Sequence, residues 1–326
     1  MAQLSTPTRS IGSATAALVV ASVLWGTTGT AASFLGVEVS PIAIGASTMA
    51  IGGLLLFVTT PRGALAAIGN RAALPWVVLG ALGVVVYPLA FYSAMNLAGV
   101  AIGNVIALGS GPVFAAVFEW LWERQRLSRR GAFSTALAAA GVVLLGIFGH
   151  VDDGGAGGNV LAGALLGLLA GFAYALYTYS STRVIRIGHS GRAAMGATFG
   201  LGALGLLPVL ILSGGSLLAS ASNVGIAAYL AIGPMFVAYV FFGLGLGTLR
   251  SSAVTTITLL EPVVATILAV VVVGERLTPV GWMSTLLILA GVTILASARS
   301  TPAEPSPPSA PPTATPLPPG ASQRAE

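Results

Sequence analysis

Residues 251–273 read SSAVTTITLLEPVVATILAVVVV, and Glu261 is the one ionisable side chain in this stretch. As an α-helix, a stretch of this length can cross a hydrocarbon core about 30 Å thick, which requires roughly 20 residues. It lacks the alternation of apolar and polar residues that a membrane β-strand shows. The stretch therefore predicts a transmembrane helix.

Nine further hydrophobic runs of similar length accompany it. The ten predicted spans are residues 11–34, 40–60, 72–95, 99–122, 131–149, 159–182, 193–213, 224–247, 251–273 and 279–298. The composition agrees with them, because 56% of the residues are hydrophobic and only 7% are charged, whereas soluble domains carry roughly 25% charged residues. We predict an all-α membrane protein with ten transmembrane helices, in which the 43 glycines favour close helix packing.

A shift of 150 residues aligns the first half of the chain with the second. It matches Gly111-Pro112-Val113 with Glu261-Pro262-Val263, and Ala140-Gly141-Val142 with Ala290-Gly291-Val292, without a gap. Each half contains five spans, an odd number, so the second copy must enter the membrane in the opposite orientation. We therefore predict a 5+5 inverted repeat, an arrangement that suits alternating access to a site between the halves.

The charge distribution predicts how the chain is oriented, because basic connections stay on the cytoplasmic side. With both termini in the cytoplasm of a bacterium, 13 of the 14 basic residues lie on that side of the cytoplasmic membrane. The predicted segments are a cytoplasmic tail (1–10), a first five-helix repeat (11–149), a periplasmic linker (150–158), a second five-helix repeat (159–298) and a cytoplasmic tail (299–326). Nine of the last 28 residues are proline, so we expect that tail to be disordered.

Four short motifs carry a resemblance to a known family. In chain order they are Leu24-Trp25-Gly26, Glu261-Pro262-Val263, Gly274-Glu275-Arg276-Leu277 and Ala290-Gly291-Val292. In this order and spacing the sequence resembles the EamA-type carriers of the drug/metabolite transporter superfamily, from about residue 14 to residue 298. The first copy departs from the second by having Gly111 at the position equivalent to Glu261.

The resemblance implies a secondary transporter of small metabolites or drugs. It implies a central cavity formed mainly by spans one to four and six to nine, and relatives that export amino acids or related compounds by alternating access. The expected partners are a small-molecule substrate and the lipid bilayer, with protons as a coupling ion and a homodimer left open. No cofactor is expected.

Glu261 and its surroundings are the first candidates for the transport site. An ionisable group at this depth costs about 2.5–3.5 kcal/mol on insertion scales, so Glu261 should face the bundle interior or a wet cavity. Its role is left open between a structural hydrogen-bonded group, a gating or proton-coupling group, and a direct substrate contact. Pro262 has no N–H and should free the carbonyl of Thr258, as Pro112 should free that of Leu108 in the first half. We expect helix breaks at these two symmetric positions, which point to the transport site. Helical spacing places Asn104 on the face of the fourth span that corresponds to this region of the ninth.

Aromatic residues inside the spans are the second group of candidates. Trp25, Tyr92 and Tyr174 are expected to stack against a ligand or to serve only as packing. Glu119 and Glu123 lie at the end of the fourth span, just before four arginines, and are expected to form a solvated ion-pair cluster there.

Other functions find less support in the sequence. The chain has no cysteine and no lysine, and both histidines lie between hydrophobic runs, so a base for an intramembrane hydrolase and the ligands for a metal site are lacking. The arginines are scattered over short connections rather than gathered on one face, which argues against nucleic-acid binding. A channel or a non-transporting membrane scaffold remains the alternative to a carrier.

Overall fold

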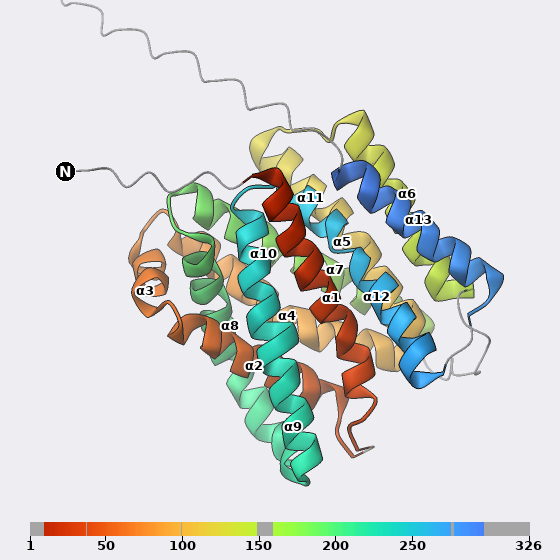
Figure 1. Cartoon of the computed structure of the whole chain (residues 1–326). Helices are drawn as coiled ribbons and strands as arrows, with labels where there is room; N and C mark the ends of the chain where they lie inside the picture. The colour runs from red at the N-terminus through yellow and green to blue at the C-terminus, as the bar shows by residue number, and fades with distance from the viewer. Residues whose placement is uncertain (1–9, 37, 99, 149–158, 275–276, 297–326) are drawn as a thin grey trace, which may run out of the picture.

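The structure is a computed structural model that describes residues 10–36, 38–98, 100–148, 159–274 and 277–296. Within these ranges every regular element of more than one residue is helical (Figure 1). The prediction of an all-helical protein is confirmed for this part of the chain. The tails 1–10 and 299–326 and the linker 150–158 lie almost entirely outside the described residues.

The helices follow one another with short connections. They are α1 (Ile11–Ala32), α2 (Pro41–Val58), α3 (Pro61–Gly69), α4 (Leu74–Ala98), α5 (Val100–Glu123), α6 (Arg129–Phe148), α7 (Val160–Arg186), α8 (Gly191–Ser213), the 3₁₀ turn η1 (Gly214–Leu218), α9 (Ala221–Leu230), the π-helical segment η2 (Ala231–Val237), α10 (Ala238–Leu246), α11 (Ser251–Ile257), α12 (Leu260–Leu268), the π-helical segment η3 (Ala269–Val273) and α13 (Pro279–Ala296).

Seven helical segments in the described ranges are long and apolar enough to cross a membrane. They are Ile11–Ala32, Pro41–Val58, Leu74–Met95, Leu161–Arg186, Gly191–Leu218, Ala221–Leu246 and Ser251–Val272. Each of these segments overlaps one of the predicted spans.

Several helices begin where a serine stands before the apolar run. The side chains of Ser10, Ser40, Ser190 and Ser220 each accept a hydrogen bond from the backbone N–H three residues later. This N-cap satisfies one of the donors that a helix start leaves free. The caps explain why α1 and α2 begin within one residue of the predicted starts.

Helix α3 lies between the second and third predicted spans, where only a connection was expected. It starts at Pro61, in the first-turn position that suits proline, and it buries Ala64 and Ala67. Its nine residues are too few to cross a bilayer, so a search for long hydrophobic runs does not detect it.

The two halves of the chain are interleaved rather than side by side. Helix α4 packs along α7, α2 along α8, α5 along α7, and α1 between α10 and α12, while α6 and α13 pair with each other (Figure 1). Glycines allow this closeness: a Cβ added at Gly53 would lie 2.5 Å from the carbonyl oxygen of Phe199, and one at Gly83 would lie 2.8 Å from that of Ala173. Both contacts join the first half to the second.

Candidate functional site: a cavity between the halves

A cavity of about 90 Å³ lies between the helices of the two halves. Its lining residues are Trp25, Thr28, Gly45, Thr48, Met49, Tyr87, Pro88, Phe91, Tyr92, Leu108, Tyr174, Tyr177, Pro234, Met235, Tyr239 and Glu261. They come from α1, α2, α4 and α5 of the first half, and from α7, η2, α10 and α12 of the second. Among the described residues none from α8 lines this cavity, so the contribution that the resemblance implied for the seventh span is not seen here.

Seven of the sixteen described lining residues are aromatic. The ring centroids of Trp25 and Tyr239 lie 5.0 Å apart, and those of Phe91 and Tyr92 lie 5.4 Å apart. The ring centroids of Tyr87 and Tyr174 lie 6.0 Å apart. Rings at these separations gain from edge-to-face and tilted contacts in addition to their burial, so the wall is a continuous aromatic surface.

Hydrogen bonds fix the orientation of three of the tyrosines. The Tyr174 hydroxyl lies 2.7 Å from Thr258 Oγ1, and the Tyr177 hydroxyl lies 2.7 Å from the Tyr239 hydroxyl. All four residues are buried. A buried hydroxyl without a partner costs about 1–3 kcal/mol, and these pairs avoid that cost.

Glu261 is the acidic residue among the described residues that line the cavity. It is the second residue of α12, and its side chain is half-buried and borders the cavity. Within the described part of the chain, its carboxyl group has no ion-pair or hydrogen-bond partner. A carboxyl group at this depth therefore faces the cavity interior, where a proton, water or a ligand can meet it.

The ninth predicted span is divided next to Glu261. Helix α11 ends at Ile257 and α12 begins at Leu260, and the carbonyl of Thr258 accepts a hydrogen bond from the Glu261 N–H at 2.9 Å. The carbonyl that Pro262 cannot bond is thus satisfied one residue earlier, by a tighter turn. In the first half α5 continues through Pro112 without interruption, so the expectation of a helix break at Pro112 is wrong.

A second irregularity lies across the cavity. The segment η2 contains Pro234 and takes the π-helical form, and both Pro234 and Met235 line the cavity. Single π-helical turns occur frequently at functional sites, because they redirect side chains and leave backbone groups free. Two helices of the second half are therefore irregular where they meet the cavity.

The candidate residues from the sequence largely come together here. The cavity is lined by Trp25, Tyr92, Tyr174 and Glu261. Thr258 does not line it but hydrogen-bonds to Tyr174, which does. The side chain of Asn104 lies outside the described residues, although Leu108, one turn further along α5, is in the lining.

Three tyrosines of the cavity were missed by the sequence reasoning. Tyr87, Tyr177 and Tyr239 all lie within predicted spans. An aromatic residue well inside a span, the signal that selected Tyr92, would have found them as well.

A buried carboxylate lies where the end of α5 meets the start of α11. Glu119 is 1% exposed, and its Oε1 accepts the Ser252 N–H at 2.9 Å while its Oε2 accepts the Ser252 hydroxyl at 2.7 Å. The same Oε2 lies 2.6 Å from Arg250 Nη2. The negative charge sits at the N-terminus of α11, where free N–H groups stabilise an anion. We call these three residues the α5–α11 clamp.

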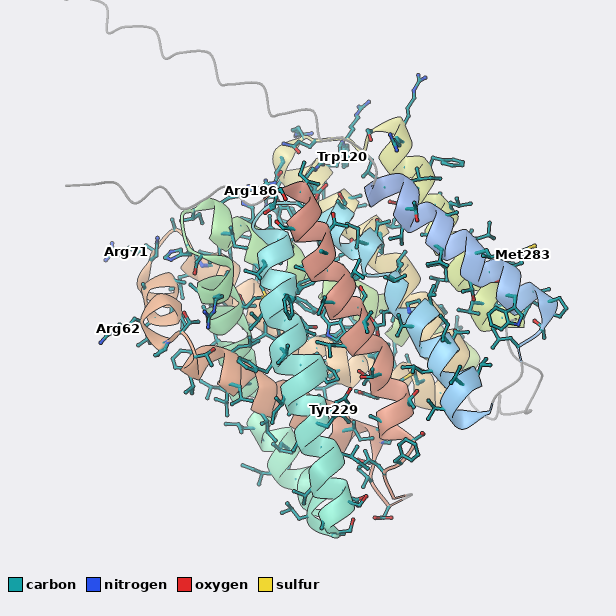
Figure 2. All side chains as sticks on the ribbon, in the orientation of Figure 1. Arg62, Arg71, Trp120, Arg186, Tyr229 and Met283 are labelled. Atoms are coloured by element: carbon teal, nitrogen blue, oxygen red, sulfur yellow. The ribbon has the colours of Figure 1, made fainter. Side chains whose placement is uncertain are left out.

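Glu123 joins α5 to α7 at the same end. Its Oε1 accepts a hydrogen bond from the Tyr179 hydroxyl at 3.0 Å, lies 3.7 Å from Arg183 Nη1, and pairs with Arg186. Figure 2 shows Arg186 at the upper end of the bundle. The partners of Glu119 and Glu123 thus come from the second half of the chain, and the expectation of a solvated cluster with the neighbouring arginines is wrong for Glu119.

A smaller polar contact ties the loop between α1 and α2 to α9. The buried Asn223 donates to Glu38 Oε1 at 3.0 Å and accepts from the Gly36 N–H at 3.2 Å. Hydrogen bonds to its own backbone N–H and to Asn223 lower the pKa of Glu38. Glu38 is exposed to solvent, so this contact is expected to add little stability.

No three His, Asp or Glu side chains come together as metal ligands in the ranges that the structure covers.

Known proteins identify the architecture. The model of the EamA-like transporter family matches residues 12–147 and again residues 161–297. The chain is similar to the uncharacterized transporter YwfM of Bacillus subtilis (strain 168), with 31% identity over 86% of this chain and 93% of that protein. It is also similar to an uncharacterized transporter of Clostridium kluyveri, with 28% identity over 51% of this chain and 53% of that protein.

A solved structure shares the fold. A protein known from a crystal structure superimposes with a TM-score of 0.72 over 86% of this chain and 96% of its own, at 23% identity. The helices, the double match and the relatives agree with the resemblance seen in the sequence. This multi-pass membrane protein belongs to the EamA-like transporter family.

Proposed function

We propose that this protein is a secondary transporter that exports small metabolites, among them amino acids or related compounds, or drugs, by alternating access to the cavity between its halves. The observation that carries the proposal is the cavity itself, which is shared by both halves and bordered by the carboxyl group of Glu261. We place the protein in the bacterial cytoplasmic membrane with both termini in the cytoplasm.

The proposed architecture has ten spans arranged as a 5+5 inverted repeat. Besides the seven long apolar segments, α5, α6 and α13 would complete the ten. The contacts support a two-fold relation, because exchanging the halves turns the α4–α7 pair into α1–α10 and the α5–α7 pair into α1–α12, while α2–α8 and α6–α13 map onto themselves. A bundle with this symmetry can exchange the conformations of its halves and so expose the cavity to either side.

The α5–α11 clamp is the element that we propose to open and close on the cytoplasmic side. Glu119 lies on the first half, and Arg250 and Ser252 lie on the second, so movement of one half against the other must separate them. The shift of 150 residues places Ala269 at the position equivalent to Glu119, and Val100 at the position equivalent to Arg250. The matching clamp is therefore missing from the other side, which makes the two closed states unequal in energy.

Glu261 is proposed to couple transport to proton movement. Its carboxyl group has no cationic partner among the described residues and faces a cavity that opens in turn to each side. A carboxyl group in that position is most easily buried in its neutral form, and hydration of the opened cavity favours ionisation. Proton uptake and release can thereby accompany each change of access.

Reconstitution tests the proposed function against its alternative. The purified protein in liposomes is assayed for uptake and efflux of labelled amino acids, short carboxylates and cationic compounds. A carrier gives saturable transport and counterflow, in which unlabelled substrate on one side drives labelled substrate to the other. Electrical current without saturation would indicate a channel, and the absence of both for every compound would indicate a scaffold.

A further inference from the structure

The charges around the cavity point to the kind of substrate. Glu261 contributes a carboxyl group, and none of the described lining residues is an arginine; the chain contains no lysine. A substrate carboxylate or phosphate would therefore lie near Glu261 without a positive partner, which is costly in a region shielded from water. A positively charged substrate group is favoured at the same place, because it would pair with Glu261.

The aromatic wall provides a second, independent feature that suits a cation. Tyr87, Tyr92, Tyr174 and Tyr239 line the same cavity as Glu261, and Trp25 packs on Tyr239. The face of an aromatic ring carries a partial negative charge and attracts a cation within about 6 Å of its centre. Several rings beside one carboxyl group form the kind of cage that binds ammonium groups.

The hydroxyl groups of the wall are compatible with this preference. The Thr258 hydroxyl donates to the carbonyl of Thr255, so the Tyr174 hydroxyl donates to Thr258 Oγ1, and one of Tyr177 and Tyr239 donates to the other. Two of these three hydroxyls are therefore not free to donate to an anion. Those of Tyr87 and Tyr92 have no hydrogen-bond partner within the described part of the chain and border the cavity. A phenol hydroxyl can accept a hydrogen bond from an ammonium N–H as well as donate one, so these two groups can hold a cation.

We propose that the cavity takes a compact organic cation, an amine without a carboxylate, with its positive charge between Glu261 and the rings of the aromatic wall. The inference rests on the proposed transport function and narrows it from amino acids and related compounds to amines. The volume of about 90 Å³ supports a compact ligand, since pockets for drug-sized molecules measure roughly 300–1,000 Å³. When Glu261 is neutral, binding releases its proton, and the carboxylate then pairs with the ammonium group.

Three probes that share one phenylethyl skeleton test the charge preference. They are 2-phenylethylamine, which is a cation, phenylalanine, which adds a carboxylate to the same amine, and 2-phenylethanol, which is neutral. Binding to the purified protein in lipid nanodiscs is measured by calorimetry at pH 8. We expect the amine to bind at least tenfold more tightly than either of the others. Equal or tighter binding of phenylalanine or the alcohol would overturn the proposal, as would binding by none of the three.

Variants of Glu261 separate a charge contact from a general effect on folding. Glu261→Gln should reduce the preference for the amine over the alcohol to less than threefold, whereas Glu261→Asp should keep most of it. Glu38→Gln, a charge change outside the cavity, is the matched control and should leave the preference unchanged. If Glu261→Gln elutes as a monodisperse protein and keeps the full preference, the cation is not held by this carboxyl group and the proposal fails.

Counterflow measured with the same probes distinguishes this inference from the proposed function. Saturable counterflow of phenylalanine or the alcohol, but not of the amine, would refute the cation preference while supporting transport. Saturable counterflow of the amine that phenylalanine does not inhibit is the expected result.

Discussion

Removal of the Glu119 carboxylate should open the end of the bundle that we propose to face the cytoplasm. Glu119→Ala removes the two hydrogen bonds from Ser252 and the pair with Arg250. A hydrogen bond to a charged group contributes about 1.5–3 kcal/mol, and the pair with Arg250 contributes little because the Arg250 side chain is 36% exposed and can be solvated. We take the loss from the closed state as about 3 kcal/mol, which corresponds to a change of roughly 100-fold in the closed-to-open ratio.

The Glu119→Gln variant should change the closed-to-open ratio less than Glu119→Ala does. The amide oxygen can still accept the Ser252 N–H, but the charge is lost. A change of about 1.5 kcal/mol, or roughly tenfold, is expected.

A single cysteine at Ser181 reports the opening, because the next residue, Thr182, hydrogen-bonds to Ser251 at the start of α11 at 2.8 Å. Ser181 is fully buried on α7, and its hydroxyl has no hydrogen-bond partner, so Ser181→Cys should be tolerated. Because the chain has no native cysteine, labelling by a membrane-impermeant maleimide from the cytoplasmic side measures this position alone. The rate should rise in the order wild type, Glu119→Gln, Glu119→Ala, and the Glu38→Ala control should match wild type. Equal rates in all four proteins, with transport preserved, would refute the role of the clamp.

Three further predictions concern topology, the helix break and helix packing. Single cysteines replacing Asp152 and Arg129 should label from the periplasmic and the cytoplasmic side, respectively; labelling from the same side would exclude the proposed span count. Pro262→Ala restores a backbone N–H at the break and should slow transport without reducing membrane insertion, so unchanged turnover would show that the break is not used. Gly53→Ala should lower the unfolding temperature in detergent, because the added Cβ meets a backbone carbonyl at 2.5 Å, whereas Gly29→Ala, where a Cβ meets nothing within 4 Å, should not; similar unfolding temperatures would contradict the packing argument.

The helices and the acidic residue of the cavity, Glu261, could be predicted because both depend on local properties of the sequence. A long apolar run must be helical in a membrane, since every backbone group has to be bonded within the segment. A lone carboxyl group in such a run must face away from lipid. The sequence around Glu261 therefore predicted its place in the bundle interior.

The contacts that depend on distant partners could not be predicted in the same way. Glu119 is separated from Arg250 by 131 positions, while Arg124 and Arg126 follow it within a few residues, so proximity in the sequence suggested the wrong partners. The π-helical form of η2 was missed for a related reason: Pro234 marks an irregularity, but the way in which the freed carbonyl is satisfied depends on its surroundings.

The accumulation of substrate by Glu261→Gln tests the central claim most directly. Glutamine keeps the size of the side chain and most of its hydrogen-bonding capacity but cannot titrate. In proteoliposomes carrying a pH difference, and at a substrate concentration raised to offset its weaker binding, the variant should still exchange labelled for unlabelled substrate across the membrane. It should fail to accumulate substrate against its gradient, while Glu38→Gln should behave as wild type. Full pH-driven accumulation by Glu261→Gln would contradict the account.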